Sequence, residues 1–381
     1  PRSTPKPSSA ASDVYKRQVE SLKRVYERNK NYLLIVNDMD RPTPTAEILD
    51  YIFPIIKESK IKVIIASGSH RKPNECELKV IFGNYYEFFK DKIIFHDAKD
   101  ERSLKYLGKT KRGTEIFMNK IIFDFDKILV IGSIEPHYFA GFTGGRKAFL
   151  PGVSGYKTIE MNHKLALEDG ALPLKLRGNP VHEDMEDAIN FIDRKNVISF
   201  QVIYVPEKGI VDTSCGDIID SFYTLIPVAE KIFSYKLKEK ADILITKATP
   251  PLSRTLYQSH KAIENCVQGL KKGGIIILIA ECEEGIGGKV FFEHIRSKTP
   301  DEVLEEVKSN FKLGFQKSGR FARVLKEYEV FVVSEIEGSL FGKSGIRVYK
   351  NVKDAVDDAL KIKGSNSKIV YVPHGTEVVI L

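Results

Sequence analysis

The stretch Tyr32-Leu33-Leu34-Ile35-Val36 is followed at once by the polar turn Asn37-Asp38-Met39-Asp40-Arg41-Pro42. A short apolar run that contains β-branched residues is typical of a buried strand. A helix is predicted at 44–59. The same order of strand, loop and helix then recurs at 61–66, at the loop that ends in His70, and at 73–82. This alternation predicts a parallel sheet covered by helices.

Further strands extend this pattern through the chain. A strand at 127–132 leads directly into Pro136-His137, and a charged helix is predicted at 19–30. A second block begins near Lys238, with strands expected at 241–246, 273–280, 328–333 and 368–372. We therefore expect two α/β domains with mainly parallel sheets and an active site in the cleft between them. The predicted domains are 19–237, which carries the cofactor and the catalytic groups, and 238–381, with the lysine-rich segment 231–240 as a hinge.

The composition is that of a globular cytoplasmic protein. Of 381 residues, 42% are hydrophobic and 29% charged, and no apolar run approaches the roughly 18 residues of a membrane span. The four cysteines form no Cys-x-x-Cys motif, which favours a reducing compartment and argues against a structural zinc site. The net charge of +8 is too mild and too scattered to indicate nucleic acid, and suits an enzyme of small anions.

The first 18 residues, from Pro1 to Gln18, are rich in Pro, Ser and Ala and have no periodic apolar pattern. They resemble a translated sequencing adapter, so we predict a non-native leader and exclude it from the fold. A native disordered tail is the alternative interpretation.

Chemically versatile side chains follow several of the predicted strands. In parallel sheets, ligands bind at the carboxyl ends of the strands, and Asp38, Arg41, His70 and His137 all fall at such ends. For a lone histidine, a capping or core-edge role is the simpler interpretation of His70. Asp38 and Arg41 are equally compatible with a local ion pair in the turn. Their convergence on one sheet edge favours a common site.

A glycine-rich turn runs Gly141-Phe142-Thr143-Gly144-Gly145-Arg146-Lys147. It is not a P-loop, because no Ser or Thr follows the lysine and the glycine spacing differs. Such a turn is often purely structural. Here Gly144 and Gly145 adjoin two cations, which favours the binding of an anion such as a phosphate.

Two further groups complete the candidate constellation. His163 follows Asn162 in a predicted helix, and no histidine pair has the His-x-x-x-His spacing of a zinc helix. Gln258 and Lys261 lie three residues apart, on one face of a predicted helix, which in isolation is typical of a solvated face. The other histidines are predicted to be structural or exposed: His96, His182, His260, His294 and His374.

Together these segments resemble the lactate racemase family, the nickel-pincer enzymes, from about Tyr32 onward. The resemblance is carried by these segments: Asp38 to Pro42, Gly68 to His70, Pro136 to Lys147, Pro151-Gly152, Asn162-His163, Gly178 to His182, Tyr257 to Lys261 and Glu281-Cys282. At position 40 the chain has Asp where the family usually has Thr. Arg146 stands where a small residue is common.

The resemblance implies a nickel complex of a pyridinium bis-thiocarboxylic acid mononucleotide, attached covalently to Lys147. It implies His163 as the protein ligand to nickel, and His70 and His137 as the acid/base pair that acts on a small 2-hydroxy acid.

The remaining implied contacts are divided between cofactor and substrate. Asp38, Arg41, Thr143, Gly144 and Gly145 are implied cofactor contacts. Arg41, Gln258 and Lys261 are implied to bind the substrate. The implied protein partners are those that make and insert the nickel-pincer cofactor, and neither nucleic acid nor membrane is expected.

Two other function classes stay open at this point. One is a non-catalytic binding protein for a phosphorylated nucleotide, although storage does not require paired histidine bases. The other is a metal-dependent hydrolase that uses the histidines directly. The carboxylate-plus-histidine cluster that such a hydrolase needs is not evident from the spacing.

Overall fold

The computed structural model describes residues 18–381, so the predicted leader lies almost entirely outside the described residues. The chain forms two compact units. Unit 1 comprises 18–135, 142–162 and 176–230 of the described residues, and unit 2 comprises Pro136–Gly141, His163–Lys175 and Lys231–Leu381. Two short segments from the first half of the chain therefore count with the second unit. The predicted placement of the active site between two domains stays a prediction.

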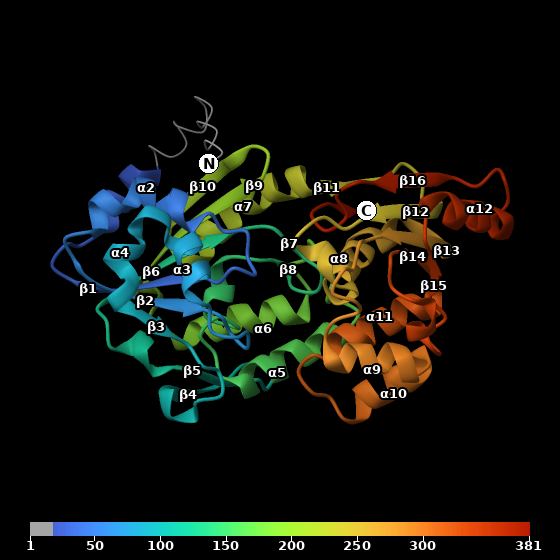
Figure 1. Cartoon of the computed structure of the whole chain (residues 1–381). Helices are drawn as coiled ribbons and strands as arrows, with labels where there is room; N and C mark the ends of the chain where they lie inside the picture. The colour runs from blue at the N-terminus through green and yellow to red at the C-terminus, as the bar shows by residue number, and fades with distance from the viewer. Residues whose placement is uncertain (1–17) are drawn as a thin grey trace. The chain divides into compact units, whose positions relative to one another are not determined.

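Unit 1 is built on a six-stranded sheet of order β10-β9-β6-β1-β2-β3 (Figure 1). All neighbours pair in parallel except β9 and β10, which form an antiparallel edge. Its strands are β1 (Asn31–Asn37), β2 (Lys60–Ala66), β3 (Ile93–Phe95), β6 (Lys127–Ser133), β9 (Val197–Val205) and β10 (Gly209–Gly216). The hairpin β4 (Leu104–Lys109) and β5 (Glu115–Asn119) stands apart from this sheet, as does the short pair β7 (Pro136–His137) and β8 (Gly141–Phe142).

After the helical residues 18–25, the helices of this half of the chain are α2 (Thr45–Ile56), α3 (Glu75–Phe82), α4 (Tyr86–Phe89), α5 (Tyr156–Lys164), α6 (Pro180–Ala188) and α7 (Ile218–Phe233). The last residues of α5 and α7 count with unit 2. A capping box at Asn74 begins α3, where the side chain accepts from Glu77 N–H and the Glu77 carboxylate accepts from Asn74 N–H.

The core of unit 1 explains why β1 lies inside the sheet. Residues 32–36 are all buried, on both faces, as expected for a parallel strand between two neighbours. One face packs Leu34 and Val36 with Ile48 and Ile52 of α2. The register Asn37↔Ala66 brings the ends of β1 and β2 level, so the turns that follow them begin at the same edge.

Unit 2 has a five-stranded, fully parallel sheet of order β15-β14-β13-β12-β16. Its strands are β12 (Ala241–Lys247), β13 (Leu270–Ile279), β14 (Glu329–Val333), β15 (Arg347–Tyr349) and β16 (Ile369–Val372), and a separate parallel pair joins β11 (Ser234–Tyr235) to β17 (Val379–Ile380). Its helices, yellow to red in Figure 1, are α8 (Leu256–Cys266), α9 (Lys289–Ser297), α10 (Pro300–Ser309), α11 (Phe315–Glu327) and α12 (Val352–Lys363).

Alternate residues of the strands in unit 2 supply two separate apolar layers. Ile243, Ile275 and Ile277 pack with Ala355 and Ala359 of α12. Their neighbours along the strands face the other side, against α8, α9 and α11. Because successive side chains of a strand point to opposite faces, both faces must be covered for such strands to be buried.

The strands predicted from apolar runs are confirmed to within a few residues, and the mixed α/β fold with mainly parallel sheets is confirmed. The helix predicted at 19–30 is wrong at its end, because helical residues stop at 25. The chain turns there so that Tyr26 stacks on Tyr32 of β1, at 4.3 Å between ring centroids. The strands β9 and β10 were not predicted. Among residues 18–381, no helix combines the length and apolar character needed to cross a bilayer.

Candidate active site

The predicted pair of Asp38 and His70 meets at the edge of the unit 1 sheet, where β1 and β2 end. His70 Nδ1 lies 2.7 Å from Asp38 Oδ2, which is a short, charge-assisted hydrogen-bond distance. Asp38 is 8% exposed, whereas the His70 side chain is 45% exposed. The buried carboxylate therefore orients an accessible imidazole, and the prediction that strand ends bring these groups together is confirmed.

The turn after β1 places Arg41 beside this pair in the chain. Arg41 N–H donates to Asp38 O at 3.3 Å, which closes the turn. The Arg41 side chain is half-buried, and within residues 18–381 its guanidinium has no hydrogen bond or ion pair. A cation in this condition is available to a ligand anion, and the predicted role of Arg41 in binding one stays a prediction.

A second carboxylate joins this group. Asp40 Oδ2 lies 3.2 Å from His70 Nδ1, and the ligand atoms of Asp38, Asp40 and His70 are all within 4.8 Å of one another. A carboxylate–histidine cluster is thus present although the sequence spacing did not reveal it. The contact joins two turns some 30 residues apart, and only the parallel pairing of β1 with β2 brings them together.

The glycine-rich turn forms a tight 3-10 turn at Gly145–Ala148, with positive φ at Gly144 (80°) and Gly145 (51°). A Cβ atom on Gly144 would lie 2.8 Å from Gln201 Oε1, so only glycine fits there. Gly145 N–H donates to the same Gln201 oxygen at 3.0 Å. The Thr143 hydroxyl donates to Ser133 O at 2.8 Å. These groups are therefore engaged in building the turn, and their predicted contacts with a cofactor stay a prediction.

Lys147 and Arg146 follow inside the same turn, and both are buried. Lys147 is 8% exposed, and its amide donates to Gly144 O at 3.1 Å. Arg146 is fully buried, donates to Phe142 O at 3.0 Å, and lies 4.4 Å from the Phe222 ring centroid. Burial lowers the pKa of the Arg146 guanidinium to about 10, so it stays charged at neutral pH. The turn therefore holds a lysine amine away from bulk water.

His137 lies in unit 2, at the end of β7, and is 9% exposed. Ala140 N–H donates to its Nδ1 at 3.3 Å. The rings of Tyr138 and Phe139 lie 5.1 and 4.5 Å from the imidazole centroid. An imidazole nitrogen that accepts from a backbone N–H carries no proton, so Nε2 carries the proton of the neutral ring.

His163 lies in the last turn of α5 and is half-buried. Its ring meets Phe139 edge-on, at 5.2 Å between centroids, so Phe139 contacts both predicted histidines of unit 2. Among residues 18–381, the one group of three or more His, Cys, Asp and Glu side chains with metal-ligand spacing is the Asp38 cluster, and His163 is not in it. A metal on His163 would therefore take its other ligands from a small molecule, as the predicted pincer complex requires.

Gln258 and Lys261 lie on α8, which Thr255 caps by accepting from Gln258 N–H at 3.3 Å. Gln258 Oε1 is buried and has no hydrogen-bond partner among the described residues. A buried amide oxygen without a partner is costly unless a ligand supplies the donor. This observation fits a substrate or cofactor group at Gln258.

Sequence reasoning missed two cations of α11. Lys317 is 6% exposed, donates to Tyr257 O at 2.8 Å, and lies 3.4 Å from the centroid of that ring. Arg320 is 8% exposed and bonds Glu264 Oε2 at 2.6 Å. Their burial distinguishes Lys317 and Arg320 from the other Lys and Arg residues of α11. In the sequence alone, all of these cations look alike.

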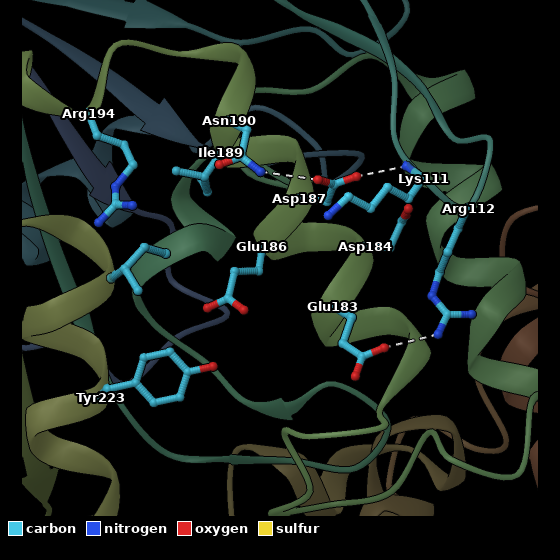
Figure 2. Close-up of a pocket in the computed structure, with 11 residues that line it drawn as sticks. Lys111, Arg112, Glu183, Asp184, Glu186, Asp187, Ile189, Asn190, Arg194 and Tyr223 are labelled. Atoms are coloured by element: carbon cyan, nitrogen blue, oxygen red, sulfur yellow. Dashed lines mark hydrogen bonds and ion pairs between the residues drawn. The ribbon is translucent and has the colours of Figure 1, made fainter.

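A separate cavity of about 710 Å³ opens within unit 1 (Figure 2). It is lined mainly by charged side chains from α6 and its surroundings, and several of these are held by hydrogen bonds. Arg112 reaches Glu183 at 3.0 Å, and the Lys111 amide donates to Asp187 at 2.7 Å (Figure 2). None of the predicted site residues lines it.

Comparisons with known proteins agree with the resemblance found in the sequence. The lactate racemase N-terminal domain matches residues 14–172, and the lactate racemase C-terminal domain matches residues 237–380. The chain belongs to the lactate racemase family. Members of this family are isomerases that depend on nickel, and this chain is a racemase.

Named relatives cover almost the whole chain. The lactate racemase of Thermoanaerobacterium thermosaccharolyticum is 29% identical over 394 residues, which span 98% of this chain and 92% of that protein. The lactate racemase of Lactiplantibacillus plantarum is 26% identical over 373 residues, which span 95% and 87%.

Two solved structures are similar to this one. The lactate racemase apoprotein of T. thermosaccharolyticum matches with a TM-score of 0.88 at 28% identity, covering 97% of this chain and 93% of that chain. A Thermotoga maritima protein matches with a TM-score of 0.74 at 15% identity, covering 97% and 98%, which shows a shared fold.

Proposed function

We propose that this racemase interconverts the enantiomers of a small 2-hydroxy acid, lactate or a close analogue, with a nickel-pincer nucleotide attached to Lys147. The substrate class follows from the names of its relatives. When bound, the nickel complex supplies an electrophilic centre that accepts the α-hydrogen as hydride and returns it. Lys147 would hold the cofactor covalently, and His163 would be the protein ligand to nickel.

The observation that carries the proposal is the opposite hydrogen bonding of the two histidines. His70 Nδ1 faces a buried carboxylate, so it holds a proton and leaves Nε2 as a base. His137 Nδ1 accepts from a backbone N–H, so its neutral ring carries the proton on Nε2, where it can donate a hydrogen bond to the substrate oxygen. The two rings thus present one acceptor and one hydrogen-bond donor, and whichever ring returns the proton to the substrate does so as an imidazolium ion.

The proton steps balance with these two groups. One histidine takes the hydroxyl proton while the α-hydrogen leaves with its electron pair, and the substrate becomes a planar 2-keto acid. For the enantiomer to form, the other histidine, starting as an imidazolium ion, would deliver its proton to the substrate oxygen from the opposite side and would end neutral. After one turnover the histidines have exchanged roles, so the reverse reaction is equally well served.

Three polar groups are proposed to hold the substrate carboxylate and hydroxyl group. The Arg41 guanidinium and the Lys261 amine supply charge, and the unpartnered Gln258 Oε1 supplies an acceptor. Charge-assisted hydrogen bonds to a carboxylate fix its orientation and convert binding energy into alignment of the reacting atoms.

The proposal is tested on protein produced together with the pincer-synthesis proteins. The peptide that contains Lys147 should carry the added mass of the cofactor, and Lys147→Ala should carry none. His70→Ala should retain the cofactor and lose turnover, because it removes a base and not the anchor. Lys208→Ala, at an exposed lysine in the β9–β10 turn, is the matched control and should behave as the parent. Turnover by Lys147→Ala would overturn the proposed attachment.

A further inference from the structure

We propose that Asp38, Asp40 and His70 form a second metal site, for a zinc-like divalent ion, and that an ion bound there inhibits the enzyme. The proposal that the ion inhibits the enzyme rests on the proposed function of His70 as a base. The proposal that the ion binds rests on geometry alone and is independent of the cofactor.

The spacing of the three ligand atoms suits a small tetrahedral ion. With bonds of 2.0–2.2 Å, two ligands of such an ion lie about 3.4 Å apart. His70 Nδ1 lies 2.7 Å from Asp38 Oδ2 and 3.2 Å from Asp40 Oδ2. Both carboxylates therefore point toward the same nitrogen. For an ion to bind between them, the ligand atoms would have to move apart by less than about 1 Å.

The backbone holds two of these ligands in place. Asp40 N–H donates to Asp38 Oδ1 at 3.2 Å, so the turn orients the Asp38 carboxylate and leaves Oδ2 for the histidine. In the turn after the neighbouring strand, His70 N–H donates to Ser67 O at 2.9 Å. Since both turns leave adjacent parallel strands, the site is organised before any ion binds, which lowers the entropic cost of binding.

Charge and exposure also favour a cation. With a neutral imidazole the cluster carries two negative charges. The Asp40 and His70 side chains are 60% and 45% exposed, so water can complete the coordination. The Arg71 guanidinium interacts with both aspartates, but it is hydrogen-bonded to Glu77 at 2.8 Å. Asp40 adds a second carboxylate at a position where the family usually has threonine.

The donor set selects the class of ion. One imidazole nitrogen with two carboxylate oxygens suits zinc and related first-row divalent ions. Magnesium prefers six oxygen ligands in near-ideal octahedral geometry and keeps its waters. A neutral imidazole that binds an ion through Nδ1 carries its proton on Nε2, so His70 would have no free nitrogen left to accept the substrate proton. Substrate deprotonation at that ring would slow.

The binding test uses the full-length apoprotein with His163→Ala, so that the proposed nickel ligand does not contribute. Zinc titrated against a competing chromogenic chelator should show one equivalent bound, and magnesium should not displace it. Loss of an outer-shell partner of a metal ligand already weakens binding by about tenfold. Asp40→Thr removes a ligand itself, so it should weaken zinc binding by more than that. Asp91→Thr, which removes an exposed carboxylate elsewhere in unit 1, should leave binding unchanged. Equal zinc affinity in Asp40→Thr and Asp91→Thr would overturn the site.

The inhibition test uses the loaded holoenzyme. Zinc should reduce turnover, a chelator should restore it, and Asp40→Thr should shift the inhibitory zinc concentration upward by the same factor as the binding constant. If zinc binds at the cluster but turnover is unaffected, the proposal that the ion inhibits the enzyme is overturned while the site stands. If no preparation turns over a 2-hydroxy acid, the proposed function fails, and the apoprotein titration still decides the metal site.

Discussion

Replacing Arg320 by methionine should destabilise unit 2 more than any surface change on the same helix. The buried guanidinium donates to three backbone carbonyls, at 3.0 Å to Ala166, 2.7 Å to Ala171 and 3.2 Å to Tyr138. It also bonds Glu264 Oε2 at 2.6 Å, and that carboxylate is 3% exposed. One side chain thus ties the segments Pro136–Gly141 and His163–Lys175 to the body of unit 2.

The magnitude follows from what the substitution leaves behind. Methionine fills much of the volume but donates nothing, so Glu264 becomes a buried charge without its counter-ion. Removing one partner of a buried ion pair costs about 3–5 kcal/mol. For a unit of this size that lowers the Tm by about 6–20 °C, provided that unit 2 unfolds cooperatively.

The assay compares two substitutions three residues apart on α11. Arg323 is 42% exposed, and its ion pair with Asp169, at 3.4 Å, is a surface contact worth about 0–1 kcal/mol. Urea unfolding of Arg320→Met and Arg323→Met should therefore differ by more than about 2 kcal/mol. Adding Glu264→Leu to Arg320→Met should recover part of the loss, because the orphaned charge is removed.

Local opening gives a second readout. Leu174 N–H donates to Gly141 O at 3.0 Å, and this bond joins the two segments that Arg320 holds. Hydrogen exchange in peptides from these segments should accelerate in Arg320→Met and not in Arg323→Met. Equal unfolding free energies and equal exchange in the two variants would refute the assignment of Arg320 as the clamp.

Two further predictions concern unit 1. Burial, with added effects of Arg146 and Lys147, lowers the pKa of His182 to about 2, so the folded protein keeps it neutral while the unfolded chain takes up a proton below pH about 6.5. The neutral His182 therefore contributes fully to stability above that pH and contributes less as the pH falls. Between pH 7 and 5, the free energy of unfolding measured in urea should fall by about 2 kcal/mol less in His182→Asn than in the parent. Equal losses in the two proteins would contradict this. Gly144→Ala, with φ of 80° and a Cβ only 2.8 Å from Gln201 Oε1, should lose about 2–5 kcal/mol by the same assay. Gly209 also has a positive φ, of 73°, but an added Cβ there would meet no atom within 4 Å. Gly209→Ala should therefore lose only the stability that backbone strain costs. An equal loss of stability in both variants would show that packing around residue 144 plays no role.

Local patterns were enough to predict much of the fold. Apolar runs such as 32–36 became buried strands because a strand with neighbours on both sides must be apolar on both faces. The same logic placed Asp38 and His70 at one edge, since parallel strands end together. The motif at Gly141–Lys147 could likewise be recognised as a tight turn, because positive φ at Gly144 and Gly145 demands glycine. The strands β9 and β10 escaped prediction although seven residues of β9 are buried.

Periodicity and turn residues act over a few positions, so the local structures and the chemical groups could be predicted from the chain alone. Which cations are buried could be learned only from the packed units. Arg320 meets Tyr138 across 182 residues of chain, and no spacing rule connects them. Only the tertiary structure showed that Asp40 shares His70 with Asp38. The reason is physical: burial and charge pairing depend on which strands become neighbours, and that depends on the packing of the whole unit.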